Sequence, residues 1–223
     1  MRLIKYIVVS IFSLSSMVLA ADQQDFLLIP KVGKIEIIAH AAVPEHGVGP
    51  FLTLQTEDGK LLKRIDFEFG GNPGHPCTLR FKTFHQNSPP GPLIVALAST
   101  PAVSAVLFEA VILGFIDGKV RELTANHIEG QSINCLCFGY FGNHRSLGFV
   151  YLEDIYLDDV PEAHYDPHRY QAKLYEWQDN QFATVGSKKT KNKYRYCEDA
   201  AVELGYECQL QIFHELNPYS KCK

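Results

Sequence analysis

Short runs with the composition of β-strands fill the chain after residue 20, and they constrain the fold more than any other feature. Each run is rich in Val, Ile, Phe and Tyr and is bounded by Gly, Pro, Asn or Asp, as strands separated by turns are. The runs are KIEIIA, FLTLQT, KRIDFEF, TLRFKTF, LIVALAS, VLFEAVILGF, INCLCFGYF, LGFVYLED, YQAKLYEW and FATVGS. Helical spacing is plausible in CEDAAVELG, where Gly205 supplies a stop signal. The pattern predicts an all-β, antiparallel protein.

Three pairs of turn residues recur at a spacing of about 60 residues. Each pair separates two β-patterned runs and can adopt the positive φ angles of a tight hairpin turn. The pairs are Asp58-Gly59, Asp117-Gly118 and Asp179-Asn180, and nearly the same spacing separates Pro44, Pro101 and Pro161 and also Cys77, Cys135 and Cys197. We interpret the spacing as an internal repeat whose units bury their faces against their neighbours. Independent hairpins of a β-sandwich are the alternative.

Residues 1–20 have the layout of a secretory signal peptide. Arg2 and Lys5 precede an apolar run that is too short to span a membrane, and small residues favour cleavage after Ala20. We therefore expect a periplasmic or secreted protein without a membrane span after the signal is removed. The predicted organisation is a signal peptide (1–20), a repeat-containing β domain (21–187) and a basic, Cys-rich C-terminal segment packed on that domain (188–223).

The charge balance argues against nucleic-acid binding. Without residues 1–20, 19 Lys and Arg stand against 25 Asp and Glu, a net charge of −6, and nucleic-acid binding requires a basic face. The basic residues of SKKTKNKYRYC, at 188–195, are the exception. Such a run is most often a solvated linker and sometimes a docking strip for an acidic surface.

Six cysteines follow the predicted signal peptide. An even number of cysteines in an exported chain favours disulfides over a zinc cluster, and the pairing is not determined by the sequence. They are Cys77, Cys135, Cys137, Cys197, Cys208 and Cys222.

The segment EDIYLDDVPEAHYDPH, residues 153–168, concentrates acidic residues and histidines. Calcium binds six to eight oxygen ligands in a flexible loop, and the candidate ligands for it are Asp154, Asp158, Asp159 and Glu162. An extended chain would instead place alternate residues on one side as a zinc or copper array, formed by Glu162, His164, Asp166 and His168. A solvated acidic turn without a metal is the third interpretation.

The stretch LEDIYLDDVPEAHYDPHRYQAKLYEWQDNQFATVGS resembles an FG-GAP or VCBS-type β-propeller repeat. In that family an acidic loop follows one strand, and two strands around an aromatic residue and a tight turn come next. Asp154, Asp158 and Glu162 stand at acidic positions of the loop, whereas Tyr156 and Asp159 depart from its pattern. The resemblance implies a propeller-like fold with calcium as a possible ligand. It also implies a likeness to bacterial periplasmic inhibitors and immunity proteins that block lysozyme-like cell-wall hydrolases.

The sequence carries no nucleophile elbow, zinc-protease motif or Gly-rich phosphate loop, so we do not expect an enzyme. Tyr175 and Trp177 lie two residues apart and share a strand face, either in the core or as an anchor for a partner. We therefore expect an exported protein-binding module, with an exported hydrolase or toxin as its partner. The alternative is a metal- or glycan-binding module built on the acidic, histidine-containing loop.

Overall fold

A computed structural model describes nine stretches of the chain. They are residues 23–42, 48–68, 78–84, 91–101, 106–131, 135–141, 146–155, 166–206 and 210–211. The predicted signal peptide lies outside them. Within the described residues, no helix has the length and apolar character needed to cross a membrane.

The described strands form three antiparallel sheets, and in each of them four consecutive strands are neighbours in chain order. The first sheet contains β1 (Gln23–Ile29), β2 (Gly33–His40), β3 (Phe51–Thr56) and β4 (Leu61–Asp66). The second contains β5 (Thr78–Phe84), β6 (Leu93–Pro101), β7 (Val106–Ile116) and β8 (Lys119–Glu122), with β9 (Ile128–Gln131) also paired to β7. The third contains β13 (Gln181–Lys189), β12 (Arg169–Gln178), β11 (Ser146–Ile155), β10 (Cys135–Phe141) and β14 (Leu210–Gln211) in that order.

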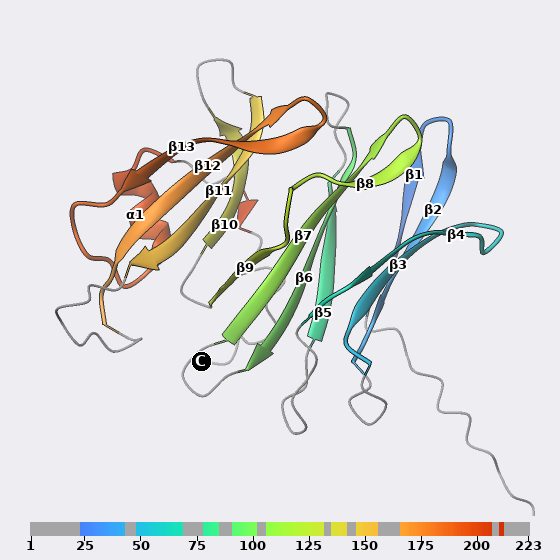
Figure 1. Ribbon diagram of the computed structural model, residues 1–223, viewed down its shortest axis with the longest axis horizontal. Helices are drawn as coiled ribbons and strands as arrows, with labels where there is room; N and C mark the ends of the chain where they lie inside the picture. Colours follow the sequence, from blue (N-terminus) through green and yellow to red (C-terminus); the bar gives the residue numbers. More distant parts are fainter. Residues whose placement is uncertain are drawn as a thin grey trace, which may run out of the picture.

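The three sheets are stacked as successive layers (Figure 1). One apolar cluster fills the space between the first and second sheets, and its residues include Ile37, Leu54 and Val111. A second cluster, which includes Phe108 and Phe149, joins the second sheet to the third. The burial of this apolar surface is the main favourable contribution to such a stack.

The middle sheet is buried on both faces. Leu93 to Ser99 of β6 are all buried, and alternate residues of the strand face opposite layers. Ile94 and Ala96 belong to the cluster shared with the first sheet, whereas Val95 and Leu97 belong to the cluster shared with the third. A strand covered on both sides has no polar face, which explains the continuous apolar runs LIVALAS and VLFEAVILGF.

The predicted turn pairs occupy the same place in all three sheets, between the third and the fourth strand of each meander. Asp117 and Gly118 both have positive φ, as do Asp179 and Asn180, which agrees with tight two-residue turns. The first turn differs, because Gly59 has a positive φ and Asp58 does not. The spacing of about 60 residues therefore corresponds to one four-stranded sheet with its connection to the next.

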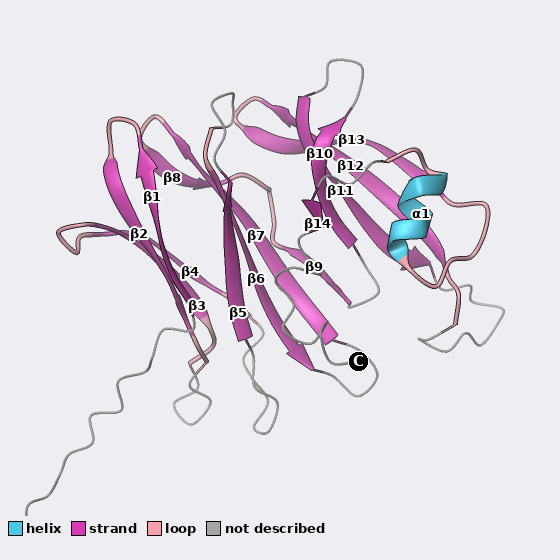
Figure 2. Cartoon of the chain, turned by 180° about the vertical axis from the view of Figure 1, so that it is seen from behind, coloured by secondary structure: helices cyan, strands magenta, loops and turns pink. Residues whose placement is uncertain are grey.

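The prediction of an all-β, antiparallel protein is confirmed, whereas the predicted propeller-like arrangement is not found among the described residues, whose three sheets are stacked. Each blade of a closed propeller packs between two others. Here the outer face of the third sheet packs instead on α1 (Cys197–Glu203) (Figure 2). The outer face of the first sheet includes Leu28, whose side chain is 74% exposed. Four-stranded units stack by the same face-to-face packing in both architectures, so the sequence pattern does not distinguish a linear stack from a ring.

A disulfide fastens α1 to the third sheet. It joins Cys135, the first residue of β10, to Cys197, the first residue of the helix, with a Cα–Cα distance of 5.9 Å. Both residues are buried in the apolar cluster that also holds Ala200 and Tyr170. Cys137 is disulfide-bonded as well, whereas Cys77, Cys208 and Cys222 lie outside the described residues. The cysteines that the structure describes are thus bridged, as the sequence predicted.

We expect the Cys135→Ser, Cys197→Ser double variant to unfold more easily than the parent protein. The bridge closes a loop across 62 residues, and native disulfides of this kind contribute roughly 2–4 kcal/mol by restricting the unfolded chain. Urea unfolding followed by the fluorescence of Trp177 measures the change. Reduced and denatured parent protein, refolded in reductant, is the control and should lose at least as much. Equal stability of oxidised parent and double variant would show that apolar packing alone holds the helix.

Candidate functional site

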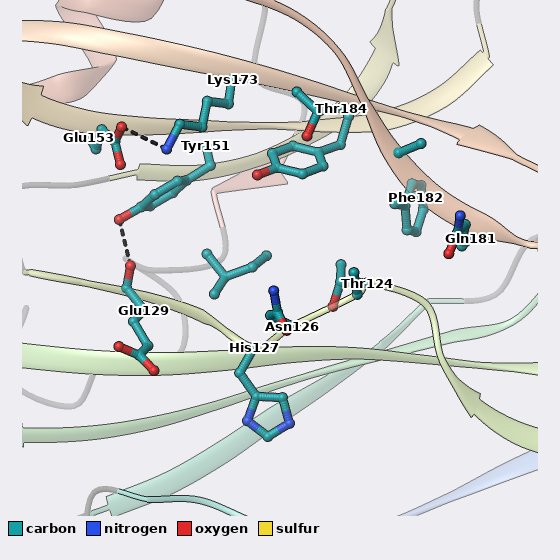
Figure 3. Close-up of a pocket in the computed structure, with 14 residues that line it drawn as sticks. Thr124, Asn126, His127, Glu129, Tyr151, Glu153, Lys173, Gln181, Phe182 and Thr184 are labelled. Atoms are coloured by element: carbon teal, nitrogen blue, oxygen red, sulfur yellow. Dashed lines mark hydrogen bonds and ion pairs between the residues drawn. The ribbon is translucent and has the colours of Figure 1, made fainter.

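A cleft of about 480 Å³ opens between the second and third sheets (Figure 3). One wall is the segment 124–129, which links β8 to β9 and includes the start of β9. The other wall comes from β11, β12 and the first half of β13. Ligand sites of proteins commonly have volumes of about 300–1,000 Å³. This cleft is therefore the candidate binding site.

Hydrogen bonds between the two sheets mark both ends of the cleft. At one end the main-chain N–H of Phe182 donates to the carbonyl oxygen of Leu123 at 2.6 Å. At the other end the hydroxyl of Tyr151 donates to the carbonyl oxygen of Glu129 at 2.8 Å (Figure 3). Gly130 permits this second contact, because a Cβ atom at that position would collide with the hydroxyl of Tyr151 and with the ring of Phe108. The two bonds fix the separation of the walls.

Aromatic and polar side chains share the lining of the cleft. Tyr175 is half-buried and stacks on Phe149 with ring centroids 4.4 Å apart. Lys173 Nζ lies 2.8 Å from a carboxylate oxygen of Glu153, and both side chains remain about one third exposed. Such a pair contributes little to stability, so its charged groups are available to a ligand. The exposed polar side chains of the lining are those of Asn126, Glu129, Gln181 and Thr184.

A buried carboxylate fastens the wall formed by residues 124–129. Glu109 is 2% exposed, and it accepts a hydrogen bond from the main-chain N–H of Glu68 at 2.8 Å. Its other carboxylate oxygen contacts Nδ1 of His127, and Nε2 of His127 lies 3.6 Å from Glu122. The ring of His127 turns away from the side chains of the third sheet (Figure 3). Because both ring nitrogens face carboxylates, we assign the Glu109–His127 pair to holding this wall in place.

The predicted metal ligands are described in part. Asp154 and Ile155 end β11 and pair with Tyr170 and Arg169 at the start of β12, so the strands bring the two ends of the acidic loop together. The Oδ2 atom of Asp154 is shielded from solvent and has no hydrogen-bond partner among the described residues.

At the far end of the loop, Asp166 is exposed and His168 is buried. His168 exchanges two main-chain hydrogen bonds with Tyr194. The remaining candidate ligands, Asp158, Asp159, Glu162 and His164, lie outside the described residues. Among the described residues, one group of three possible metal ligands has its ligand atoms close together, and it consists of Cys135, Cys197 and Glu198. The two sulfur atoms of this group form the disulfide.

The two aromatic residues proposed for partner binding lie on the same face of β12 but differ in position. Tyr175 lines the cleft. Trp177 is half-buried, packs against the cluster between the second and third sheets, and meets the ring of Phe182 edge-on with centroids 5.4 Å apart. Trp177 therefore lies beside the wall at Phe182 and provides a fluorescent reporter for it.

The basic segment after β13 is fixed to the end of α1 by Glu203. This carboxylate accepts hydrogen bonds from the main-chain N–H of Lys191 at 2.6 Å and from the hydroxyl of Tyr194 at 2.7 Å. The bond from Lys191, followed by the bond from Tyr194, lowers the pKa of Glu203. The same bond to Glu203 raises the pKa of Tyr194. Part of the basic run is thus an ordered loop.

Comparison of the chain with protein-family models, with curated proteins and with solved structures finds no match.

Most residues that line the cleft carry no signal in the sequence. One signal was present: residues 147, 149, 151 and 153 share a face of β11, and along that face Leu and Phe give way to Tyr and Glu. This change indicates a strand face that leaves the core and reaches an opening. The segment 124–129 had no comparable signal, because its position beside β13 depends on how the sheets stack.

Acid should release the loop that Glu203 holds. Because the folded-state pKa of Glu203 is lowered, its contribution is present above the ordinary carboxyl pKa and is lost as the pH falls through the lowered value. Amide exchange should show the protection factor of Lys191 falling in that range for the parent protein. Glu203→Gln keeps an acceptor oxygen but loses the charge, so the protection of Lys191 should be reduced and should no longer depend on pH in this range, and the pKa of Tyr194 should come down. Asp199→Asn, an exposed acid on the same helix, should leave the protection of Lys191 unchanged.

Metal binding by the acidic loop is testable at its two described ends. Calcium at 100 times its dissociation constant should add about 2.7 kcal/mol to the free energy of unfolding, and Asp154→Asn should remove the effect because it removes a ligand charge. Stabilisation by zinc should instead depend on Asp166, so Asp166→Asn is the matched variant. Thermal unfolding in calcium, zinc or chelator separates the two ligand sets. Equal midpoints in all three solutions would leave the segment as a solvated loop.

Proposed function

We propose that the protein is an exported binding module that holds a segment of a partner protein in the cleft between its second and third sheets. The observation that carries the proposal is the construction of this cleft. Its walls belong to two different sheets, and hydrogen bonds at Phe182 and Tyr151 join those sheets at the two ends. A site built in this way is already formed before a partner arrives, which lowers the entropic cost of binding.

The lining of the cleft suits a peptide segment with mixed polarity. Tyr175 offers apolar ring surface beside the buried ring of Phe182, whereas Asn126 and Gln181 offer amide donors and acceptors. The Lys173–Glu153 pair adds one charge of each sign at close range. Tyrosine is among the residues that carry most of the binding energy at protein interfaces. A partner segment could therefore gain both apolar contact and hydrogen bonds along one slot.

The partner that we propose is an exported hydrolase or toxin, and the protein would act as its inhibitor or immunity protein. Support comes from the export signal expected at residues 1–20 and from the disulfide between Cys135 and Cys197, which suits an oxidising compartment. The resemblance of residues 152–187 to repeats found in periplasmic inhibitors points the same way. Inhibition of exported hydrolases by the purified protein tests this proposal directly.

A glycan-binding module is the second candidate. The observation in its favour is that Tyr175 and Tyr151 line the same cleft as the side-chain amides of Asn126 and Gln181. Rings with an apolar body and a polar tip suit ligands that combine C–H faces with hydroxyl groups. Cell-wall oligosaccharides are the natural probes for this alternative.

Gln181→Ala and Tyr175→Ala should weaken partner binding, because both side chains line the cleft. Truncating an interface hot spot typically costs 2 kcal/mol or more, which is about a thirtyfold loss of affinity. Gln178→Ala is the matched control, since Gln178 pairs with Gln181 across the hairpin, is exposed, and does not line the cleft. Capture from a periplasmic extract identifies the partner, and calorimetry with the purified partner measures each variant.

Inhibition of lysozymes of several types by the purified protein then tests the inhibitor proposal. Loss of inhibition in Gln181→Ala, with inhibition kept in Gln178→Ala, would support it. A folded protein that inhibits no hydrolase, captures no exported protein, and instead binds cell-wall oligosaccharides through Tyr175 would favour the glycan-binding module.

A further inference from the structure

The cleft exposes an open strand edge. β13 is the last strand in the order of the third sheet, so its main chain pairs with β12 on one side only. Phe182 uses its outward N–H to bond Leu123. Beyond that residue, no main-chain hydrogen bond from the outer edge of β13 is present among the described residues.

The pairing register shows which groups of β13 point into the cleft. In an antiparallel pair, residues alternate between those whose N–H and C=O face the partner strand and those whose groups face away. Gln178 and Gln181 close the two-residue hairpin, and the N–H of Phe182 points outward to Leu123. Ala183 therefore bonds with β12, and the N–H and C=O of Thr184 point outward. Thr184 lines the cleft and its side chain is exposed.

The opposite wall also has main-chain groups without protein partners. Residues 124–127 lie between β8 and β9, and none of them makes a main-chain hydrogen bond to another described residue. Backbone groups without a protein partner bond to water or are available to another chain. The segment 124–127 and the outward main-chain groups of β13, which are the carbonyl of Phe182 and the N–H and carbonyl of Thr184, lie on opposite walls of the cleft.

The features of β13 that hinder pairing with another strand lie outside the cleft. Proteins guard open edges with bulges and with lysines. The register of β13 shifts opposite Leu174/Tyr175, just beyond Thr184, and Lys188 and Lys189 end the strand. Ala183 and Thr184, inside the cleft, have neither device. The outer edge of β13 is therefore protected against strand pairing along its solvent-exposed half, and it is available for pairing where the cleft begins.

We propose that the cleft binds its partner as an extended peptide strand that pairs with the outer edge of β13 at Thr184. This inference rests on the proposed function and adds the mode of recognition. The carbonyl of Phe182 and the N–H and carbonyl of Thr184 bond the peptide main chain, and the wall at 124–127 covers its other side. Main-chain pairing supplies affinity, and side chains such as Tyr175 and Lys173 select the sequence.

Thr184→Pro tests the pairing. Proline removes the outward N–H and leaves the bonds to β12 intact, because proline is tolerated on an edge strand where the N–H faces solvent. Thr184→Val is the matched control, since it removes the hydroxyl and keeps the N–H. The probe is an octapeptide selected from a random phage library on immobilised parent protein and then synthesised with blocked ends. Trp177 fluorescence and calorimetry report its affinity.

We expect the selected peptide to bind Thr184→Val within threefold of the parent and Thr184→Pro at least about tenfold more weakly. The same peptide with N-methyl groups on alternate residues, in the register that faces β13, should lose binding to the parent protein. Amide exchange of Thr184 in the parent protein should slow when the peptide is bound. The last two measurements do not depend on the folding of Thr184→Pro.

Three outcomes would overturn the inference. They are a selection that yields no peptide, equal affinity for Thr184→Pro and Thr184→Val, and unchanged exchange at Thr184 in the complex. The proposed function is tested separately, through Gln181→Ala and the captured partner. A protein partner that depends on Gln181 and Tyr175 but is insensitive to Thr184→Pro would uphold the binding module and reject strand pairing.

Discussion

Burial of the middle sheet on both faces is the constraint from which the rest of the structure follows. Residues of β6 and β7 alternate between two apolar clusters, so neither face of this sheet can be left in water. The first and third sheets each cover one face, and each has an outer face that the stack does not cover. Helix α1, fastened at Cys197, covers that face on the third sheet. The order of layers is thus set by the requirement to hide two apolar faces.

The cleft arises where the edge of the middle sheet is interrupted. β7 pairs with β8 at one end and with β9 at the other, and the chain between them leaves the sheet. Leu123 still bonds to Ile112, at 2.8 Å, but residues 124–127 bend out toward the third sheet. Glu109 holds this segment from one side through His127. The interruption between β8 and β9 therefore produces the cleft between two otherwise closely packed sheets.

The sequence located parts of the site but not their arrangement. Tyr175 is a candidate from the sequence because it shares a strand face with Trp177, and the structure places it in the cleft. Asp154 is a candidate metal ligand from the sequence, and in the structure its Oδ2 atom is buried without a hydrogen-bond partner among the described residues. Gln181 and Asn126 carry no local pattern that distinguishes them from other surface amides. Their importance comes from the approach of two sheets whose strands are far apart in sequence.

The sequence by itself determined the strands, the hairpin turns and their recurrence, because these depend on interactions between residues close along the chain. Alternating side chains, positive-φ turn residues and the glycine after the helix act within a few residues of one another. Only the tertiary structure decided that the units stack in a line, that α1 covers the last one, and that β13 lies beside Leu123. These outcomes depend on which apolar faces meet. Face-to-face packing of similar four-stranded sheets is compatible with more than one arrangement, so it leaves no distinct local pattern in the sequence.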